Sequence, residues 1–241
     1  MIGIIGFGRF GKLTAGYLAE DFEVFVFNRT DKSAEIKKTG AHKASLKTVC
    51  QQKIVILCVP ISTFKAVLTE IGPLLKKDVV VVDVCSVKVY PTQWMQAWLP
   101  ETVSILATHP IFGPDSASDS LKDRKIFLSP IRINKKQYQK IKAYLASKEL
   151  VLIESTPEDH DEQIAISLAL THYIGRTLSE FGAVPLGIDS EGYKRLLHIL
   201  EVVEHDTWQL FYDMHRYNPY AKEKRAAFMQ AMQKIDEQIE S

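Results

Sequence analysis

The sequence has no strong excess of charge of either sign. Its 241 residues include 30 basic and 29 acidic side chains, a net charge of +1 at pH 7, and neither sign forms a long run. A balanced charge removes the electrostatic basis for binding nucleic acid or a membrane surface. No apolar run approaches the roughly 20 residues that span a bilayer. We therefore expect no nucleic-acid or membrane partner.

Cysteine is also scarce. The three cysteines, Cys50, Cys58 and Cys85, form no C-x-x-C pair. We expect reduced thiols in a reducing compartment and no metal site. The apolar opening from Met1 to Gly6 has no basic flank, so it does not resemble a signal peptide. These features favour a soluble cytoplasmic protein.

Short apolar runs alternate with helical patterns through residue 155. Runs with little polar alternation are typical of strands that are covered on both faces. The predicted strands are Ile2–Ile5, Glu23–Phe27, Ile54–Val59, Val79–Val82, Ser104–Ala107 and Ile126–Leu128. The helical patterns between them include Arg9–Ala19, Ser62–Leu68 and Lys135–Ala146. This alternation predicts an α/β domain over residues 1–155, with a doubly wound and mostly parallel sheet.

The pattern changes after Ser155. Almost no β-rich run follows, and three helices are predicted at about 157–181, 190–217 and 219–240. Thr156 before Pro157 is a good helix start, and Gly182 is a plausible stop. The sequence therefore predicts an all-helical C-terminal domain over residues 156–241.

The predicted middle helix has a wide apolar face. Its members are Leu196, Leu197, Ile199, Leu200, Val202 and Val203. Three helices form a thin layer, so we expect a second copy of the chain to cover this face in a homodimer. Packing of the whole face on the sheet domain is the alternative.

A glycine-rich motif follows the first predicted strand at once and opens a helix. It reads Gly6-Phe7-Gly8-Arg9-Phe10-Gly11, or G-x-G-x-x-G. In a Rossmann domain these glycines allow the tight turn, the approach of a pyrophosphate and the close packing of helix on strand. The helix N-terminus then offers free N–H groups to the phosphates. A merely tight strand-to-helix turn is the alternative.

The second predicted strand ends in Asn28, Arg29 and Thr30. NAD-binding domains usually place an acid there to bind the ribose 2′-hydroxyl. Asn28 carries no charge that would repel a 2′-phosphate, Arg29 can pair with one, and Thr30 can donate to it. We therefore predict NADP as the preferred cofactor, with NAD possible. The alternative for Arg29 is an ordinary solvated loop residue.

Polar groups stand where the later strands end. The backbone of Cys58-Val59-Pro60 follows the third long run and is expected to border the cofactor. Ser86 follows the next strand and His109 the one after it. Ligands of open α/β sheets bind beyond the carboxyl ends of the strands, so this hydroxyl and imidazole are expected on the cofactor's side.

With these residues the sequence resembles the prephenate/arogenate dehydrogenases of tyrosine biosynthesis. The segments that carry the resemblance are Gly6–Gly11, Asp83–Lys88, His109–Ser116, Glu158–Asp161 and Thr171–Arg176. The resemblance covers nearly the whole chain, and its most specific part is His-Pro-x-Phe-Gly-Pro. It shows neither a preceding chorismate mutase domain nor a C-terminal regulatory domain.

The resemblance implies oxidative decarboxylation of a cyclohexadienol, with hydride transfer to the nicotinamide. His109 would take the hydroxyl proton, for which an imidazole is well suited. Ser86 would bind the same hydroxyl or orient His109, and a role as helix N-cap is compatible with either. The substrate's carboxylates require cations.

The candidate ligands for these carboxylates come from both halves of the chain. They are Lys88 and the pair His172 and Arg176, which lie four residues apart on one helical face. A helix-packing role for His172 is equally open. His198 occupies the place where many prephenate-preferring relatives have an arginine, so arogenate is a second possible substrate.

Two further classes of protein are compatible with a Rossmann domain followed by helices. One is a different oxidoreductase, such as a hydroxyacid dehydrogenase or an imine reductase. The second is a redox-inactive NADPH sensor, because a fold alone does not fix a function. Ser86, Lys88 and His109 favour the dehydrogenase over both.

Overall fold

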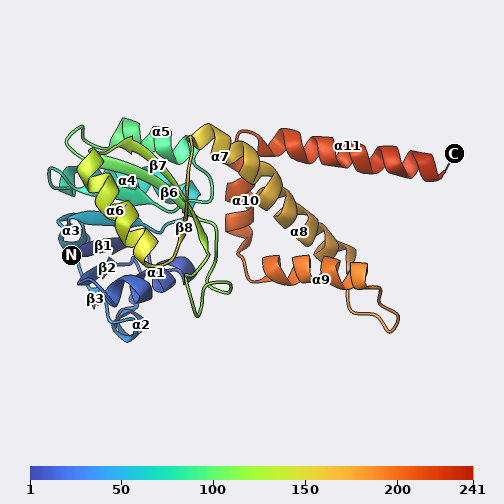
Figure 1. The fold of residues 1–241 in the computed structure, drawn as a ribbon, viewed down its shortest axis with the longest axis horizontal. Coiled ribbons are helices and arrows are strands. Elements are labelled where there is room, and N and C mark those ends of the chain that lie inside the picture. Colours follow the sequence, from blue (N-terminus) through green and yellow to red (C-terminus); the bar gives the residue numbers. More distant parts are fainter. Residues whose placement is uncertain (241) are drawn as a thin grey trace. The chain divides into compact units, whose positions relative to one another are not determined.

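The structure, a computed structural model, describes residues 1–240, apart from the side chain of Val202. The chain divides into two compact units (Figure 1). The N-terminal unit is Met1–Pro157, and the helical unit begins at Glu158. No helix among the described residues is long and apolar enough to cross a membrane.

The N-terminal unit is built on one sheet of eight strands in the order β3-β2-β1-β4-β5-β6-β7-β8. The strands are β1 (Ile2–Ile5), β2 (Val24–Phe27), β3 (His42–Lys43), β4 (Ile54–Leu57), β5 (Val80–Asp83), β6 (Ser104–Pro110), β7 (Lys125–Arg132) and β8 (Val151–Glu154). All neighbours are parallel except β6 and β7. The strand order reverses between β1 and β4, the place where doubly wound sheets bind ligands. The predicted sheet class is confirmed.

The apolar runs became strands because both of their faces are covered. All four residues of β1 and of β5 are buried. Two strands were missed: β3 has only two residues, both exposed, and β8 is an edge strand with three exposed residues. Neither has the continuous apolar run that marks a buried strand.

Helices cover both faces of the sheet. They are α1 (Arg9–Ala19), α2 (Ser33–Lys38), α3 (Leu46–Cys50), α4 (Ile61–Ile71), α5 (Val89–Trp98) and α6 (Lys135–Ser147), with a short 3₁₀ turn η1 (Gly72–Leu74). Right-handed crossovers place α1 and α6 on one face and α4 and α5 on the other (Figure 1).

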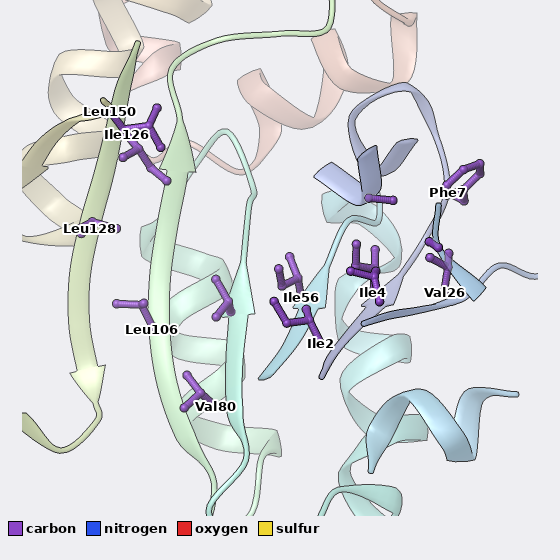
Figure 2. Packing of buried hydrophobic residues seen from close by; sticks show 14 of the residues in the cluster. Ile2, Ile4, Phe7, Val26, Ile56, Val80, Leu106, Ile126, Leu128 and Leu150 are labelled. Carbon is purple, nitrogen blue, oxygen red and sulfur yellow. The ribbon is translucent and has the colours of Figure 1, made fainter. Parts of the chain in front are cut away.

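The core on the α1 side draws one or two side chains from each of several strands. Ile2 and Ile4 of β1, Ile56 of β4 and Leu106 of β6 belong to this buried cluster. Figure 2 shows these side chains on strands of the one sheet, together with Leu128 of β7. Leu18 of α1 and Ile141 and Leu145 of α6 pack against them from the helical layer.

The helical unit contains more breaks than the sequence predicts. Its elements are α7 (Pro157–Ile164), the π-helix η2 (Ala165–Leu170), α8 (Thr171–Phe181), α9 (Glu191–Glu204), α10 (Trp208–Arg216) and α11 (Ala221–Ile239). The single helix predicted over 190–217 is wrong: it ends at Glu204 and restarts at Trp208. The Thr207 hydroxyl accepts a hydrogen bond from the Leu210 amide and caps α10.

Gly182 ends α8 as predicted, with a left-handed φ of 81°. The apolar face predicted on residues 196–203 is divided. Val203 is buried against Gly175 of α8, where a Cβ would come within 2.6 Å of the valine side chain. Leu196 is 42% exposed, and the side chain of Val202 lies outside the described residues.

Candidate active site

The glycine-rich motif forms a turn that only glycine fits at two of its positions. Gly6 has a φ of 98°, and a Cβ on it would lie 2.2 Å from the Cys58 carbonyl oxygen. A Cβ on Gly11 would lie 2.3 Å from the Gly6 carbonyl oxygen. Both contacts are far inside van der Waals distance, so these glycines set the close approach of α1, β1 and β4.

Gly8 serves a different purpose. It is exposed, and a Cβ on it would meet nothing within 4 Å. It is also the N-cap of α1, which has no side-chain cap and no acid in its first turn. The N–H groups and the positive end of the helix dipole are therefore open to an anion, and the loop fits a dinucleotide's pyrophosphate.

The Asn28 side chain forms hydrogen bonds within the protein. Its Oδ1 accepts a hydrogen bond of 2.9 Å from the Phe7 amide, and its Nδ2 donates to Thr30. The side chain thus ties the glycine loop to the end of β2. Phe7 and Asn28 were both predicted to bind the cofactor, and this bond shows that they also bind each other.

Arg29 and Thr30 extend from the end of β2 into solvent, where both are exposed. The structure records no hydrogen bond or ion pair for the Arg29 guanidinium within the described chain. An unpaired guanidinium beside a glycine-rich loop can bind a phosphate with two hydrogen bonds.

Two contacts join α1 to the segment that follows β6. Arg9 donates a hydrogen bond of 2.6 Å to Asp115, and the rings of Phe10 and Phe112 lie 6.3 Å apart. Arg9 and Phe10 were predicted to bind the cofactor. The structure shows that their side chains also connect the glycine loop to the segment after His109.

The segment Cys58-Val59-Pro60 follows β4 and leads into α4, whose N-cap is Pro60. Burial raises the pKa of the Cys58 thiol to about 12, so it stays protonated at neutral pH. Cys58 borders the glycine loop through its backbone, whose carbonyl oxygen lies close to Gly6. All three cysteines are free.

Ser86 and His109 belong to the carboxyl-terminal ends of neighbouring strands. Asp83 at the end of β5 is paired in register with Ala107 of β6, and His109 lies within β6 rather than after it. His109 is 6% exposed. The Ser86 hydroxyl is shielded from solvent and has no partner among the described residues. Ser86 is not a helix N-cap, because α5 begins at Val89 and its N-cap is Lys88.

Lys88 does not occupy the place that the sequence predicted for it. It is fully buried, as is Asp83, and it donates to both the Asp83 carboxylate and the Thr108 carbonyl. Asp83 also accepts hydrogen bonds from the amides of Cys85 and Thr108, at 3.2 and 3.1 Å. Lys88 therefore joins the ends of β5 and β6 beside Ser86 and His109, instead of facing a substrate carboxylate. Asp83, five residues before Lys88, was not predicted to belong to the site.

In the helical unit, His172 and Arg176 of α8 lie beside Asp206. The His172 Nε2 is 3.7 Å from the Asp206 carboxylate, and Arg176 donates to the Asp206 carbonyl and stacks on Trp208. Burial, with Arg176 nearby, lowers the pKa of His172 to about 4. His172 is thus a neutral imidazole at pH 7, not the cation that the sequence predicted. Its Nδ1 and the Arg176 Nε are buried without a partner among the described residues.

His198 is not brought together with His172 and Arg176. It is exposed on α9 and lies 3.3 Å from Glu201. Asp161 of α7 is fully buried and bonds to His160 at 2.8 Å. No group of three or more His, Cys, Asp or Glu side chains within the described residues could hold a metal ion.

The sheet order, the glycine turn and the uncapped α1 together define a Rossmann dinucleotide-binding protein. At the same edge of its sheet it carries a serine and a histidine.

Comparison with known proteins identifies the family. The model of the prephenate dehydrogenase nucleotide-binding domain matches residues 26–154. This chain belongs to the prephenate dehydrogenase family. A second model, described as the TYRAAT1-like C-terminal domain, matches residues 177–241.

Curated relatives match the chain over almost its whole length. Arogenate dehydrogenase 1 of Arabidopsis thaliana is 30% identical over 99% of this chain, and the match spans 39% of the plant protein. A probable arogenate/prephenate dehydrogenase of Methanocaldococcus jannaschii is 28% identical over 96% of this chain and 54% of its own length. The chain thus spans well under two thirds of these two relatives.

Among solved structures, the fold resembles prephenate dehydrogenase from A. aeolicus in complex with hydroxyphenyl propionate and NAD+. The TM-score is 0.80 at 19% sequence identity, over 99% of this chain and 90% of that one. This likeness supports the predicted order of a Rossmann sheet followed by helices.

Proposed function

We propose that this chain oxidatively decarboxylates prephenate or arogenate with transfer of a hydride to a nicotinamide cofactor. The observation that carries the proposal is the placement of Ser86 and His109. Ser86 follows the carboxyl end of β5 and His109 lies among the last residues of the adjacent strand β6, and both strands run parallel to the strand that leads into the glycine loop. The names of the relatives support the same reaction.

The bound nicotinamide supplies an acceptor for two electrons. His109 accepts the proton of the ring hydroxyl while ring carbon 4 gives up its hydride and the C–O bond gains double-bond character. The bond to the ring carboxylate then breaks, carbon dioxide leaves, and the electron pair completes the aromatic ring. His109 returns the proton to the oxygen. The unpartnered Ser86 hydroxyl binds the same oxygen or orients the imidazole.

Arg176 is the cation that we propose for a substrate carboxylate. It carries a buried Nε without a partner, and the adjacent neutral His172 offers an unpartnered Nδ1. An unsatisfied buried polar group costs about 1–3 kcal/mol, which a bound carboxylate would recover. We keep His198 as a candidate for discriminating prephenate from arogenate, because its side chain is exposed and can reach a ligand.

We propose NADP as the preferred cofactor. The residue at the end of β2 is Asn28, which bonds to the Phe7 amide, so no carboxylate stands there to bind the ribose 2′-hydroxyl. The unpaired Arg29 supports binding of a 2′-phosphate instead. NAD remains the alternative.

A direct assay tests the reaction. Purified protein is mixed with prephenate or arogenate and with NAD or NADP, and the absorbance of the reduced cofactor is followed. We expect reduction with NADP and at least one of the two substrates. No reduction in any of the four combinations, with protein that still binds NADP, would contradict the proposed reaction and favour a nucleotide sensor.

We also propose that the helical unit forms a homodimer. Phe181, Ile188 and Ile235 are 82, 96 and 56% exposed, which is unusual for large apolar side chains. Sedimentation equilibrium should give twice the chain mass. A monomer at working concentration would contradict the dimer.

A further inference from the structure

The N-terminal unit contains an apolar cavity of about 380 Å³ that belongs to no part of the proposed active site. It lies between the sheet and the pair of helices α1 and α6. Gly6, Arg29, Ser86 and His109 are not among its lining residues.

The topology of the sheet explains why this space exists. Helix α1 connects β1 to β2, and α6 connects β7 to β8, so the two helices cover the two sides of the face. The centre of the face belongs to β4, β5 and β6, whose connecting helices α4 and α5 lie on the opposite face. Ile56, Val82 and Leu106 of these strands form the floor of the cavity. Figure 2 shows Ile56 and Leu106 on this part of the sheet.

The walls of the cavity offer water few free hydrogen-bonding groups. The hydroxyl groups of the lining side chains are already bonded within the protein: the Thr14 hydroxyl donates to the Phe10 carbonyl, and the Thr108 hydroxyl to the Asp83 carbonyl. The Tyr17 hydroxyl likewise donates to the Ala117 carbonyl. A space lined in this way does not hold ordered water, so its lining groups lack contact partners until an apolar molecule enters.

One end of the cavity adjoins a second, polar cavity of about 300 Å³. The two share Tyr17, Leu121 and Lys148. A single polar group on an otherwise apolar ligand therefore has a place at this end. An apolar cavity of about 150 Å³ holds one benzene ring, so the larger volume here suits two or three rings.

The wall of the cavity is continuous with the active site. Phe10 and Leu13 on α1 line it, and α1 is the helix that begins at the glycine loop. Thr108 and Pro110, on either side of His109, line it too. Phe112 completes this wall through its contact with Phe10. A molecule in the cavity therefore contacts the helix that carries the nucleotide loop and the strand that carries His109.

We propose that this cavity is a second ligand site, for one compact apolar ring system with a single polar substituent, and that filling it tightens dinucleotide binding at the glycine loop. The physical reason is conformational entropy. A ligand in the cavity restrains Phe10 and Leu13, so α1 has less conformational entropy left to lose when the nucleotide binds.

Adjacent residues of β5 give a matched pair of variants. Val82 lines the cavity, whereas Val81 is fully buried and does not line it. Side chains of adjacent strand residues point to opposite faces. Val82→Phe should fill the space and leave Tm unchanged or raised. Val81→Phe should overpack the opposite face and lower Tm by several degrees.

The binding test uses 1-naphthol, measured by isothermal titration calorimetry on the full chain with saturating NADP. We expect one equivalent to bind to the wild type, at least tenfold weaker binding to Val82→Phe, and wild-type affinity in Val81→Leu, a smaller change that should still fold. Val82→Ala, which enlarges the cavity, should keep the site. No binding at millimolar 1-naphthol, or equal loss in Val82→Phe and Val81→Leu, would overturn the site.

Coupling is tested by titrating NADP with and without 1-naphthol. We expect the NADP Kd to fall roughly fivefold or more in its presence, with the same factor for 1-naphthol binding when NADP is added, because linkage is reciprocal. An unchanged NADP Kd with 1-naphthol bound would overturn the coupling. These readouts need no dehydrogenase activity, so they do not depend on the proposed reaction.

Discussion

Two clusters of buried polar groups, one in each unit, differ in how far their hydrogen bonds are satisfied. In the N-terminal unit, the fully buried Asp83 and Lys88 are bonded to each other and to the backbone on both sides. In the helical unit, the buried Nδ1 of His172 and Nε2 of His215 and the Nε of Arg176 have no partner among the described residues.

The difference teaches what each arrangement is suited for. A fully satisfied network holds neighbouring groups in one geometry, which is what Ser86 and His109 require for proton transfer. Unsatisfied buried groups cost free energy that a ligand with matching atoms can recover. The bonded cluster is therefore suited to positioning the proposed reacting groups, and the unsatisfied cluster is suited to binding a ligand.

The largest expected effect is on the group that the N-terminal network positions. His109→Asn removes the proposed base but keeps a polar side chain of similar size. We expect kcat to fall by roughly 10²- to 10⁴-fold, while the Kd for NADP stays unchanged. Steady-state kinetics and a nucleotide titration measure the two quantities. Turnover near that of the wild type would remove His109 from the mechanism.

The network itself is tested by Lys88→Met. This change leaves the Asp83 carboxylate buried without its cation, so the free energy of unfolding should fall by about 3–5 kcal/mol in urea titrations. The double variant Asp83→Asn with Lys88→Met is the control and should lose less, because no charge is left behind. A single variant as stable as the wild type would mean that the pair does not hold β5 to β6.

The helical unit should respond to pH through His172. Its pKa is about 4 when folded, against an ordinary value of 6.5. The unfolded chain therefore binds the proton first as pH falls, and stability is lost between pH 6.5 and about 4. The contribution is on the order of 3 kcal/mol. Urea titrations across this range should show a shallower pH dependence for His172→Gln.

His198→Gln is the matched control, since this imidazole is exposed on α9. It should leave the pH dependence as in the wild type. If the two variants behave alike, burial of His172 is not what couples the helical unit to pH.

The smallest effect concerns the cofactor. Arg29→Ala should weaken NADP binding by roughly tenfold or more, since hydrogen bonds to charged groups contribute about 1.5–3 kcal/mol. NAD binding should hardly change, and Arg124→Ala, an exposed arginine before β7, should affect neither. Fluorescence titration with both nucleotides measures this. Equal losses for NAD and NADP would refute a 2′-phosphate contact at Arg29.

Much of the N-terminal unit could be predicted because its signals are local. Strands such as Ile2–Ile5 are marked by a continuous apolar run, and the glycine spacing marks the turn after it. The strand β3 carries no such signal, since it has only two residues and both are exposed. The break at Thr207 was missed because a capping threonine inside an apolar pattern is outweighed by the pattern itself.

The candidate site was predicted in its residue types but not in its contacts. Ser86 and His109 follow from their places after strands. Lys88 was predicted as a substrate ligand because the substrate's carboxylates require cations, and only the packed sheet brings Asp83 and the Thr108 carbonyl around it. Asn28 was likewise assigned to the cofactor, yet its partner Phe7 lies 21 residues away in the chain.

The alternation of the buried strands with helices and the nucleotide turn were determined by the sequence alone, because each depends on neighbours within a few residues. Which polar groups are buried, which of them are paired, and where an apolar space is left behind the sheet were decided only by the tertiary structure. The reason is physical. Burial and pairing depend on residues that are distant in the chain, and the cavity beside Val82 exists only because two crossovers leave the middle of one sheet face uncovered.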